Sequence, residues 1–422
     1  MLGIVVYAFA AYVMARSFSE KAVPQWMTLG LVFATAAIAI TRIELLVRST
    51  RAVAQWDFVC FWLYGHAVTA HANVYAPATY HALALPVAVD AAFRREVLDV
   101  GFPYPPPSIF LFWPIGYFHN LSAASVVWLS AMLVALAIAI VVVARGYARG
   151  SRSTLVAIVA LALVLPATGQ NIALEQTNFL AVACLAVAFA ARRSFVGGVA
   201  AAFAVVVKPY LLVVVLWLAL RRRWNALLAS IATLVIASLA SIPLLGPGGL
   251  RTFLTENPST RLPSSVYAEG GAASLYAFLL KLTHKNGSLE GPVHDPIFVA
   301  IAVVLAGSTV WLAATAREAD EDLALASLVG MGLMLYPGSW MTYVIALLPA
   351  LVALGLRARS MPVAFAAMAA AFFIGNAFNG NTTLVAIVVV WLVLIIVLAG
   401  SRFAGRDATI IQFERATKAR ES

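Results

Sequence analysis

The sequence predicts an all-α, polytopic integral membrane protein. Of its 422 residues, 63% are hydrophobic and only 11% are charged, and the mean hydropathy is +0.93. Soluble domains carry about 25% charged residues, so this composition excludes an ordinary soluble fold. Apolar runs recur along nearly the whole chain. We therefore expect one integral domain over residues 1–422, with about eleven transmembrane helices.

Charge and cysteine content exclude other classes of protein. The net charge of +10 does not indicate a nucleic-acid partner, because the Lys and Arg residues stand in short clusters between apolar runs and set topology there. Cys60 and Cys184 form no CxxC pair, so neither redox chemistry nor a metal site is indicated. Residues 1–15 lack a basic n-region, which favours an additional short helix over a cleaved signal peptide.

The first conventional span, from about 26 to 40, leads into a polar and aromatic segment over 41–107. Pro, His and charged residues break this segment too often for it to cross the membrane. We expect it to form an exoplasmic loop with interfacial helices, which ends in a stiff, polyproline-like stretch from Gly101 to Pro107. The next spans are predicted at 121–143, 154–167 and 179–191.

A short re-entrant hairpin is predicted where Lys208-Pro209 interrupts the apolar stretch between Arg193 and Arg221. A straight helix would put one Arg cluster on each side of the membrane, against the positive-inside tendency. Two half-length helices with Lys208-Pro209 at the crest keep both clusters in the cytoplasm. A charge is tolerated at depth only when it faces protein or a wet cavity. The alternative is a tilted helix from which Lys208 snorkels to an interface.

The remaining spans are expected at 225–242, 297–315, 323–336, 343–356, 361–375 and 384–400. A second exoplasmic loop covers 243–295, and a basic cytoplasmic tail over 401–422 is expected to lie against anionic headgroups of the membrane lipids. With Asp57 outside, most Arg and Lys residues fall in the cytoplasm. The polar, uncharged connectors then share the opposite face; they are 170–178, 336–342 and 376–381.

Asp57 is the candidate catalytic base. It stands where the first span leaves the lipid, within the aromatic stretch Gln55–Gly65. A carboxylate beside a low-dielectric layer loses hydration, which raises its pKa and suits it to deprotonate a hydroxyl near neutral pH. The alternative is that Asp57 caps an interfacial helix whose apolar side carries aromatic residues.

Cations on the predicted outer face suit a phosphate-bearing lipid donor. Lys208, helped by Arg251 or Arg261, would hold the donor phosphate. Because these cations stabilise the departing phosphate, the reaction needs no metal and no other cofactor. One base working opposite the leaving group predicts inversion at the anomeric carbon.

Other polar and aromatic residues are candidates for contact with the sugar or the acceptor. They are Tyr104, Glu175, Gln176, Asn178 and Trp340. The alternatives stay open, because amides also hydrogen-bond neighbouring helices in lipid and aromatic residues also form interfacial belts.

Taken in order, several short motifs resemble glycosyltransferase family 87 over roughly residues 26–400. The motifs are Asp57, Asn73-Val74-Tyr75, Phe102-Pro103-Tyr104-Pro105-Pro106 with Pro114, Gln176-Thr177-Asn178, Gly198 to Lys208-Pro209, and Ser339-Trp340. These are bacterial GT-C membrane enzymes that include polyprenol-phosphate-mannose-dependent alpha-mannosyltransferases. The resemblance implies an exoplasmic Asp57 base and a polyprenyl-phosphate sugar donor in the plasma membrane. Two positions depart from the family pattern: Glu175 stands at a usual Gly, and Thr342 at a usual His.

We therefore expect a GT-C-like enzyme that moves a hexose, with mannose as the first candidate, to a glycolipid or glycan acceptor. A transporter or flippase of a lipid-linked solute is the alternative from another class. It would use the same cations without a carboxylate base, and the lack of an internal repeat weakens it. An inactive paralogue with a structural role is a third possibility, suggested by Thr342.

Overall fold

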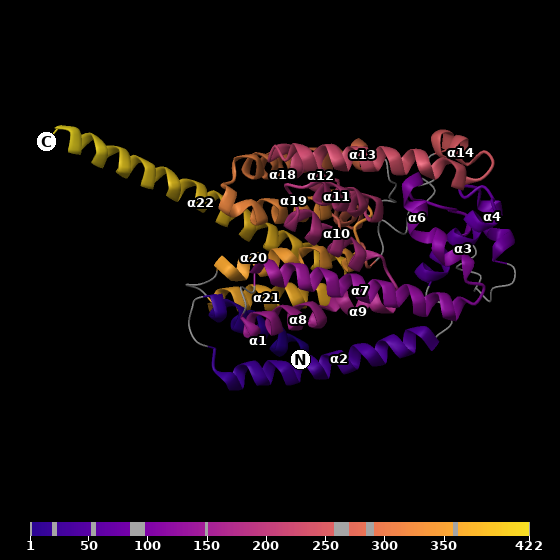
Figure 1. Cartoon of the computed structure of the whole chain (residues 1–422), viewed down its shortest axis with the longest axis horizontal. Helices are drawn as coiled ribbons and strands as arrows, with labels where there is room; N and C mark the ends of the chain where they lie inside the picture. The colour runs from indigo at the N-terminus through magenta and orange to yellow at the C-terminus, as the bar shows by residue number, and fades with distance from the viewer. Residues whose placement is uncertain are drawn as a thin grey trace.

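The computed structural model describes residues 2–18, 23–51, 56–84, 98–147, 151–256, 270–283, 291–357 and 362–421. Within them the fold is an elongated bundle of helices (Figure 1). The one β-type pairing recorded in these segments is an isolated bridge between Ala272 and Trp340. The predicted all-α fold class is confirmed.

The helices are numbered in chain order. They are α1 (Leu2–Phe18), α2 (Gln25–Arg51), α3 (Trp56–Thr69), α4 (Pro77–Leu83), α6 (Ile109–Phe112), α7 (Leu121–Tyr147), α8 (Arg152–Val164), α9 (Pro166–Ala173), α10 (Asn178–Ala190), α11 (Phe195–Val207), α12 (Leu212–Leu220), α13 (Trp224–Ser241), α14 (Gly249–Glu256), α16 (Leu275–Thr283), α17 (Gly291–His294), α18 (Pro296–Thr315), α19 (Glu321–Leu335), α20 (Leu348–Arg357), α21 (Pro362–Phe378) and α22 (Gly380–Glu421). Short 3₁₀ turns join them, among them η3 (Trp113–Tyr117), η4 (Pro209–Leu211), η5 (Ile242–Leu245) and η8 (Met341–Leu347).

Four helices of the described segments are long and apolar enough to cross a membrane; they are α7, α13 extended by η5, α18 and the first part of α22. A fifth span results if α8 and α9 are counted together, which meet at an angle of 55°. Pro166 explains this bend within the predicted span 154–167, because a proline removes a backbone donor and clashes with the preceding turn. The predicted count of about eleven spans is not confirmed.

Several boundaries differ from the sequence prediction. Helix α2 continues past residue 40 to Arg51, and α22 continues through the basic tail to Glu421, where it projects from the bundle (Figure 1). The alternative for Asp57 gives α3 a single apolar side at an interface, but Phe58, Leu63 and Tyr64 are all buried. It packs against η3 and α6 instead, because nearly every residue after Asp57 is aromatic or aliphatic.

The two ends of the hairpin predicted around Lys208 lie close together. The Arg192 guanidinium at the start of the hairpin and the Arg221 guanidinium at its end both contact the carboxylate of Glu321, at 2.6 and 3.2 Å. The two arms, α11 and α12, therefore return to the same end of the bundle, with Lys208 at the opposite end of the hairpin.

We call the end that carries these arginines the basic end. There the Tyr147 hydroxyl donates to the carboxylate of Asp322, and the Ser401 hydroxyl donates to Asp320. Residues that end α7, begin α19 and lie within α22 are thus brought together. Of the arginines that the sequence assigns to the cytoplasm, Arg192, Arg193, Arg221 and Arg223 lie together at this end, paired with Glu318 or Glu321.

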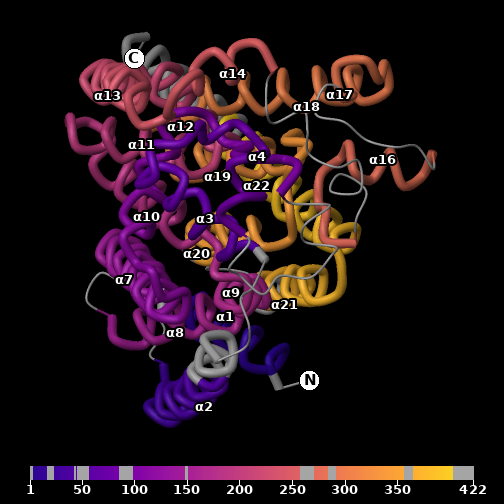
Figure 2. The backbone as a smooth tube through the Cα atoms, turned by 90° about the vertical axis from the view of Figure 1, so that its right-hand side faces the viewer, coloured from indigo at the N-terminus to yellow at the C-terminus, as the bar shows by residue number. Residues whose placement is uncertain are grey.

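We call the opposite end the polar end; it lies at the right of Figure 1 and faces the viewer in Figure 2, with α3 and α4 near its centre. There Asn171 donates to the carbonyl of Thr342, and Asn376 donates to the carbonyl of Met341. Lys281, from the second predicted loop, donates to Asn381 at 3.0 Å. The prediction that the polar connectors share one end is confirmed.

Candidate active site

Close backbone packing fixes α3 and hence Asp57 in its first turn. A Cβ at Gly65 would lie only 2.5 Å from the carbonyl oxygen of Phe112, so only glycine allows this approach. One turn earlier, the Phe61 ring stacks on Phe112 with centroids 4.8 Å apart. The Trp62 indole donates to the carbonyl of Phe118 at 2.8 Å. These contacts anchor the helix that carries Asp57 in its first turn.

The central feature of the site is an amide that bridges an acid and a cation. The Gln176 side chain donates from Nε2 to Oδ2 of Asp57 at 2.6 Å. Its other end, Oε1, accepts from the Lys208 ammonium at 3.5 Å, a long and weak contact. The predicted base, one predicted sugar ligand and the predicted phosphate ligand are thus joined, although they come from α3, the α9–α10 connection and the hairpin crest.

Lys208 lies beside a pair of stacked tyrosine rings at the crest of the hairpin. Its side chain is 2% exposed, and its ammonium lies 4.1 Å from the ring centroid of Tyr343, within cation–π range. The Tyr343 ring in turn stacks on Tyr210, with centroids 5.6 Å apart. This burial excludes the alternative in which Lys208 snorkels to an interface.

Tyr343 is a site residue that the sequence analysis missed. It directly follows Thr342, the position of the expected family His, but a single tyrosine among aromatic residues carries no signal by itself. Thr342 is buried, and its carbonyl accepts from Asn171 at 2.9 Å. In η8 it is therefore Tyr343, and not Thr342, whose side chain contacts Lys208.

The electrostatics of Asp57 are those of a partly buried carboxyl beside a cation. Burial raises its pKa above the ordinary value for an aspartic acid. The hydrogen bond from Gln176 and the positive charge of Lys208 oppose that effect without cancelling it. The Asp57 carboxyl is therefore more basic than that of an exposed aspartate, and its polar neighbours are Gln176 and Lys208.

Glu175 is placed differently from the expectation that it orients sugar hydroxyls. It is 2% exposed, its Oε1 accepts from the Ser125 hydroxyl at 2.8 Å, and its carbonyl accepts from the Trp128 indole at 2.7 Å. Its φ of 52° lies in the left-handed region, where a glycine is favoured. Burial raises the pKa of Glu175 to about 7. These contacts anchor the turn that presents Gln176.

Asn178 was also predicted to orient a sugar, and it is buried in a hydrogen-bonded network instead. Its Nδ2 donates to Oδ1 of Asn171 at 2.6 Å, and Asn171 donates to the carbonyl of Thr342. The alternative reading, in which this amide bonds neighbouring segments, is therefore the one that the contacts favour. The network ties the start of α10 to η8, which carries Tyr343.

Tyr104 and Trp340 lie at the polar end, both partly buried. The Tyr104 ring packs on Phe112 and Tyr64, with centroids 5.6 and 6.2 Å apart, and its carbonyl accepts from the Tyr75 hydroxyl. Trp340 covers Gly271, where a Cβ would come within 2.4 Å of the indole ring.

Of the two predicted arginine helpers, the structure describes only Arg251. Arg251 is exposed on α14, and no recorded contact among the described residues links it to the lysine. Arg261 lies outside the described residues. Within the same described part of the chain, no group of three or more His, Cys, Asp or Glu side chains has the geometry of a metal site.

Fold and site together define a polytopic helical membrane protein with an acid, an amide and a buried cation at its polar end. Residues 102–337 match the profile of glycosyltransferase family 87, which is more than half of the chain. The chain therefore belongs to glycosyltransferase family 87 and is a membrane glycosyltransferase. No curated protein and no solved structure matches it.

The matched region contains Gln176 and Lys208, but it begins after Asp57 and ends before Tyr343. The family assignment favours the transferase interpretation over a transporter. The parts played by Asp57 and Tyr343 rest on their contacts with the matched residues.

Proposed function

We propose that this enzyme transfers a hexose from a polyprenyl-phosphate donor to a hydroxyl of a glycolipid or glycan, with inversion. The acceptor oxygen forms the new bond to the anomeric carbon as the bond from that carbon to the phosphate oxygen breaks. The acceptor proton passes to Asp57, and polyprenyl phosphate leaves. The observation that carries the proposal is the Gln176 amide, which holds Asp57 and Lys208 in one site.

Asp57 is the base of the proposed reaction. Gln176 occupies Oδ2 of its carboxylate, and a raised pKa makes this group a better proton acceptor than an ordinary exposed aspartate. General-base catalysis of this kind contributes about 10² to 10⁴ in rate.

Lys208 is the phosphate ligand of the proposed donor complex. A buried ammonium held by a long contact to Gln176 and by the Tyr343 ring keeps donor capacity for an incoming oxyanion. A charge-assisted bond to phosphate is about twice as strong as a neutral one, and here it would form in a site shielded from water. Lys208 then stabilises the charge that develops on the leaving phosphate.

Mannose is the first sugar to test, and the outer face of a bacterial plasma membrane is the proposed location. An impermeant thiol reagent added to intact cells should label Tyr117→Cys, because Tyr117 is 64% exposed on η3 next to α3. Labelling that requires permeabilised cells would place the site on the other side.

The transfer assay uses purified enzyme, labelled polyprenyl-phosphate-mannose or polyprenyl-phosphate-glucose, and a membrane glycolipid extract as acceptor. Asp57→Asn should lower kcat by about 10² to 10⁴ while donor binding persists. Glu318→Gln is the matched control, because this carboxylate is exposed at the basic end. Full turnover by Asp57→Asn would refute the base, and loss of donor binding by that variant would point to a binding role.

A further inference from the structure

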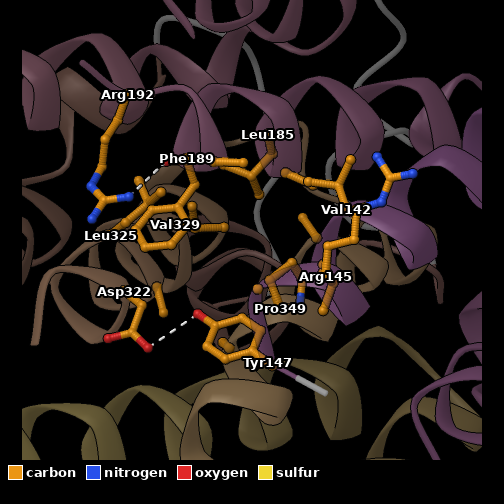
Figure 3. Close-up of a pocket in the computed structure, with 17 residues that line it drawn as sticks. Val142, Arg145, Tyr147, Leu185, Phe189, Arg192, Asp322, Leu325, Val329 and Pro349 are labelled. Atoms are coloured by element: carbon orange, nitrogen blue, oxygen red, sulfur yellow. Dashed lines mark hydrogen bonds between the residues drawn. The ribbon is translucent and has the colours of Figure 1, made fainter. Parts of the chain in front are cut away.

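A cavity of about 560 Å³ lies between α7, α10, α19 and α20, and the glycosyl-transfer proposal makes no use of it. Figure 3 shows its walls, with Leu185 and Phe189 of α10 on one side and Val329 of α19 on another. Its size falls within the range of about 300–1,000 Å³ that small-molecule sites occupy. Ordinary packing defects in protein interiors seldom exceed one water molecule.

The cavity has a buried apolar end and an exposed polar end. At the inner end Leu185, Val329 and Ala346 are nearly inaccessible, at 3%, 1% and 3% exposure. At the outer end Arg145 and Ala190 are exposed. The opening is therefore at the basic end of the bundle, away from Asp57.

The opening lies at the level where a span leaves the hydrocarbon. Helix α7 is one of the candidate spans, and Arg145 stands in its last turn. Basic residues at that point lie at the height of lipid headgroups. A pocket that opens there meets the membrane lipids, and the side chains at its inner end, Leu185, Val329 and Ala346, offer a buried water no polar partner.

The charge around the opening selects an anion. Arg145 and Arg192 both line the cavity, but the Arg192 guanidinium pairs with Glu321 at 2.6 Å, so the exposed Arg145 supplies the positive charge of the opening. The carboxylate of Asp322 also lines the cavity, but its Oδ2 accepts from the Tyr147 hydroxyl at 3.1 Å (Figure 3) and its Oδ1 accepts from the backbone N–H of Leu323. Protein donors thus occupy both oxygens of the acid, while Arg145 is exposed.

We propose that this cavity binds one chain of an anionic glycerophospholipid, with the phosphate beside Arg145 and the acyl chain reaching Val329. The site is separate from the transferase site and does not depend on the proposed donor or acceptor. The occupant is a resident lipid of the leaflet at the basic end.

Native mass spectrometry of the purified full chain tests the proposal, with phosphatidylglycerol and phosphatidylcholine of identical acyl chains as probes. We expect one phosphatidylglycerol molecule to be retained per chain. It should bind about tenfold more tightly than phosphatidylcholine, because one charge-assisted contact accounts for an affinity difference of that size. Arg145→Glu should abolish the preference. Arg152→Glu, which makes the same charge change at an exposed position outside the cavity, should keep it.

Ala186→Phe should fill the cavity and lose the lipid, whereas Ala232→Phe, on an exposed face of α13, should retain it. If Ala186→Phe does not fold, the comparison of Arg145→Glu with Arg152→Glu tests the proposal by itself. Three results would each overturn the proposal. The native chain could retain both lipids equally, or Arg145→Glu could still prefer phosphatidylglycerol over phosphatidylcholine. Polyprenyl phosphate could also compete for the cavity more strongly than phosphatidylglycerol does.

Discussion

The side-chain amide of Gln176 donates to the carboxylate of Asp57 across 119 positions of sequence, at 2.6 Å. The same amide accepts from Lys208 at its other end. An amide can serve both partners because it carries a donor and an acceptor on one planar group. It therefore joins the carboxylate and the ammonium without the two having to touch each other.

Gln176→Met should disable this bridge while preserving side-chain length. A hydrogen bond to a charged group is worth about 1.5–3 kcal/mol, so kcat/KM should fall by about 10- to 100-fold. Gln170→Met is the control, because that amide contacts the sulfur of Met341 instead. Equal losses in both variants would show that the effect is general disturbance of the polar end.

Tyr343 should matter through its ring and not through its hydroxyl. Tyr343→Phe preserves the face that Lys208 contacts, and Tyr343→Leu removes it. A buried cation–π contact contributes about 2 kcal/mol, so Tyr343→Leu should weaken donor binding by about 30-fold while Tyr343→Phe stays near the native value. Donor affinity measured by competition checks this. A loss of similar size in Tyr343→Phe would assign the role to the hydroxyl.

The pH profile of kcat/KM should report the coupling between Asp57 and Lys208. The positive charge of Lys208 lowers the pKa of Asp57, against the larger effect of burial, which raises it. Removing that charge by Lys208→Met raises the pKa of Asp57 further. As the pH falls, Asp57 is then protonated, and activity is lost, at a higher pH than in the native enzyme, so the acid limb of the profile moves to higher pH. The residual activity of Lys208→Met, measured across pH, checks the direction. An acid limb that moves downward would contradict Asp57 as the titrating base.

Glu175→Gln should leave transfer within about threefold of native, since the amide oxygen can still accept from Ser125. The pKa of about 7 means that the native carboxyl is already partly neutral near neutral pH. The measurement is kcat alongside the thermal midpoint. A drop in kcat as large as that of Asp57→Asn, with unchanged stability, would make Glu175 a second reacting carboxylate.

Glu321→Ala should destabilise the basic end strongly. Its carboxylate is 1% exposed and pairs with Arg192, Arg221 and Arg223, so its removal leaves three guanidinium groups without their shared partner. Breaking a buried ion pair costs about 3–5 kcal/mol. Glu318→Ala is the control: this carboxylate is 64% exposed, and its loss should cost no more than about 1 kcal/mol. Similar thermal midpoints for the two variants would show that Glu321 does not hold the hairpin.

Much of the fold could be predicted because membrane insertion leaves a strong imprint on sequence. Apolar runs located the helices, and the Arg clusters around the Lys208 hairpin predicted that its ends meet. Boundaries were less predictable: α2 and α22 continue into polar sequence, since a helix does not have to end where the hydrocarbon does. The surroundings of Glu175 could not be predicted either, because its motif does not reveal that its carboxyl accepts a hydrogen bond from Ser125.

The sequence by itself determined that this chain is a helical membrane glycosyltransferase and that Asp57, Gln176 and Lys208 lie at one end of it. Hydrophobic periodicity and charge asymmetry are patterns of residues that lie near one another in the sequence, so they can be recognised without knowing the tertiary structure. Only the tertiary structure decided that Gln176 bridges the other two, that the Lys208 ammonium lies over the Tyr343 ring, and that Asn178 and Glu175 bond to Asn171 and Ser125. Those choices depend on packing between segments more than a hundred residues apart, where a rotation of one helix face redirects every side chain that it carries.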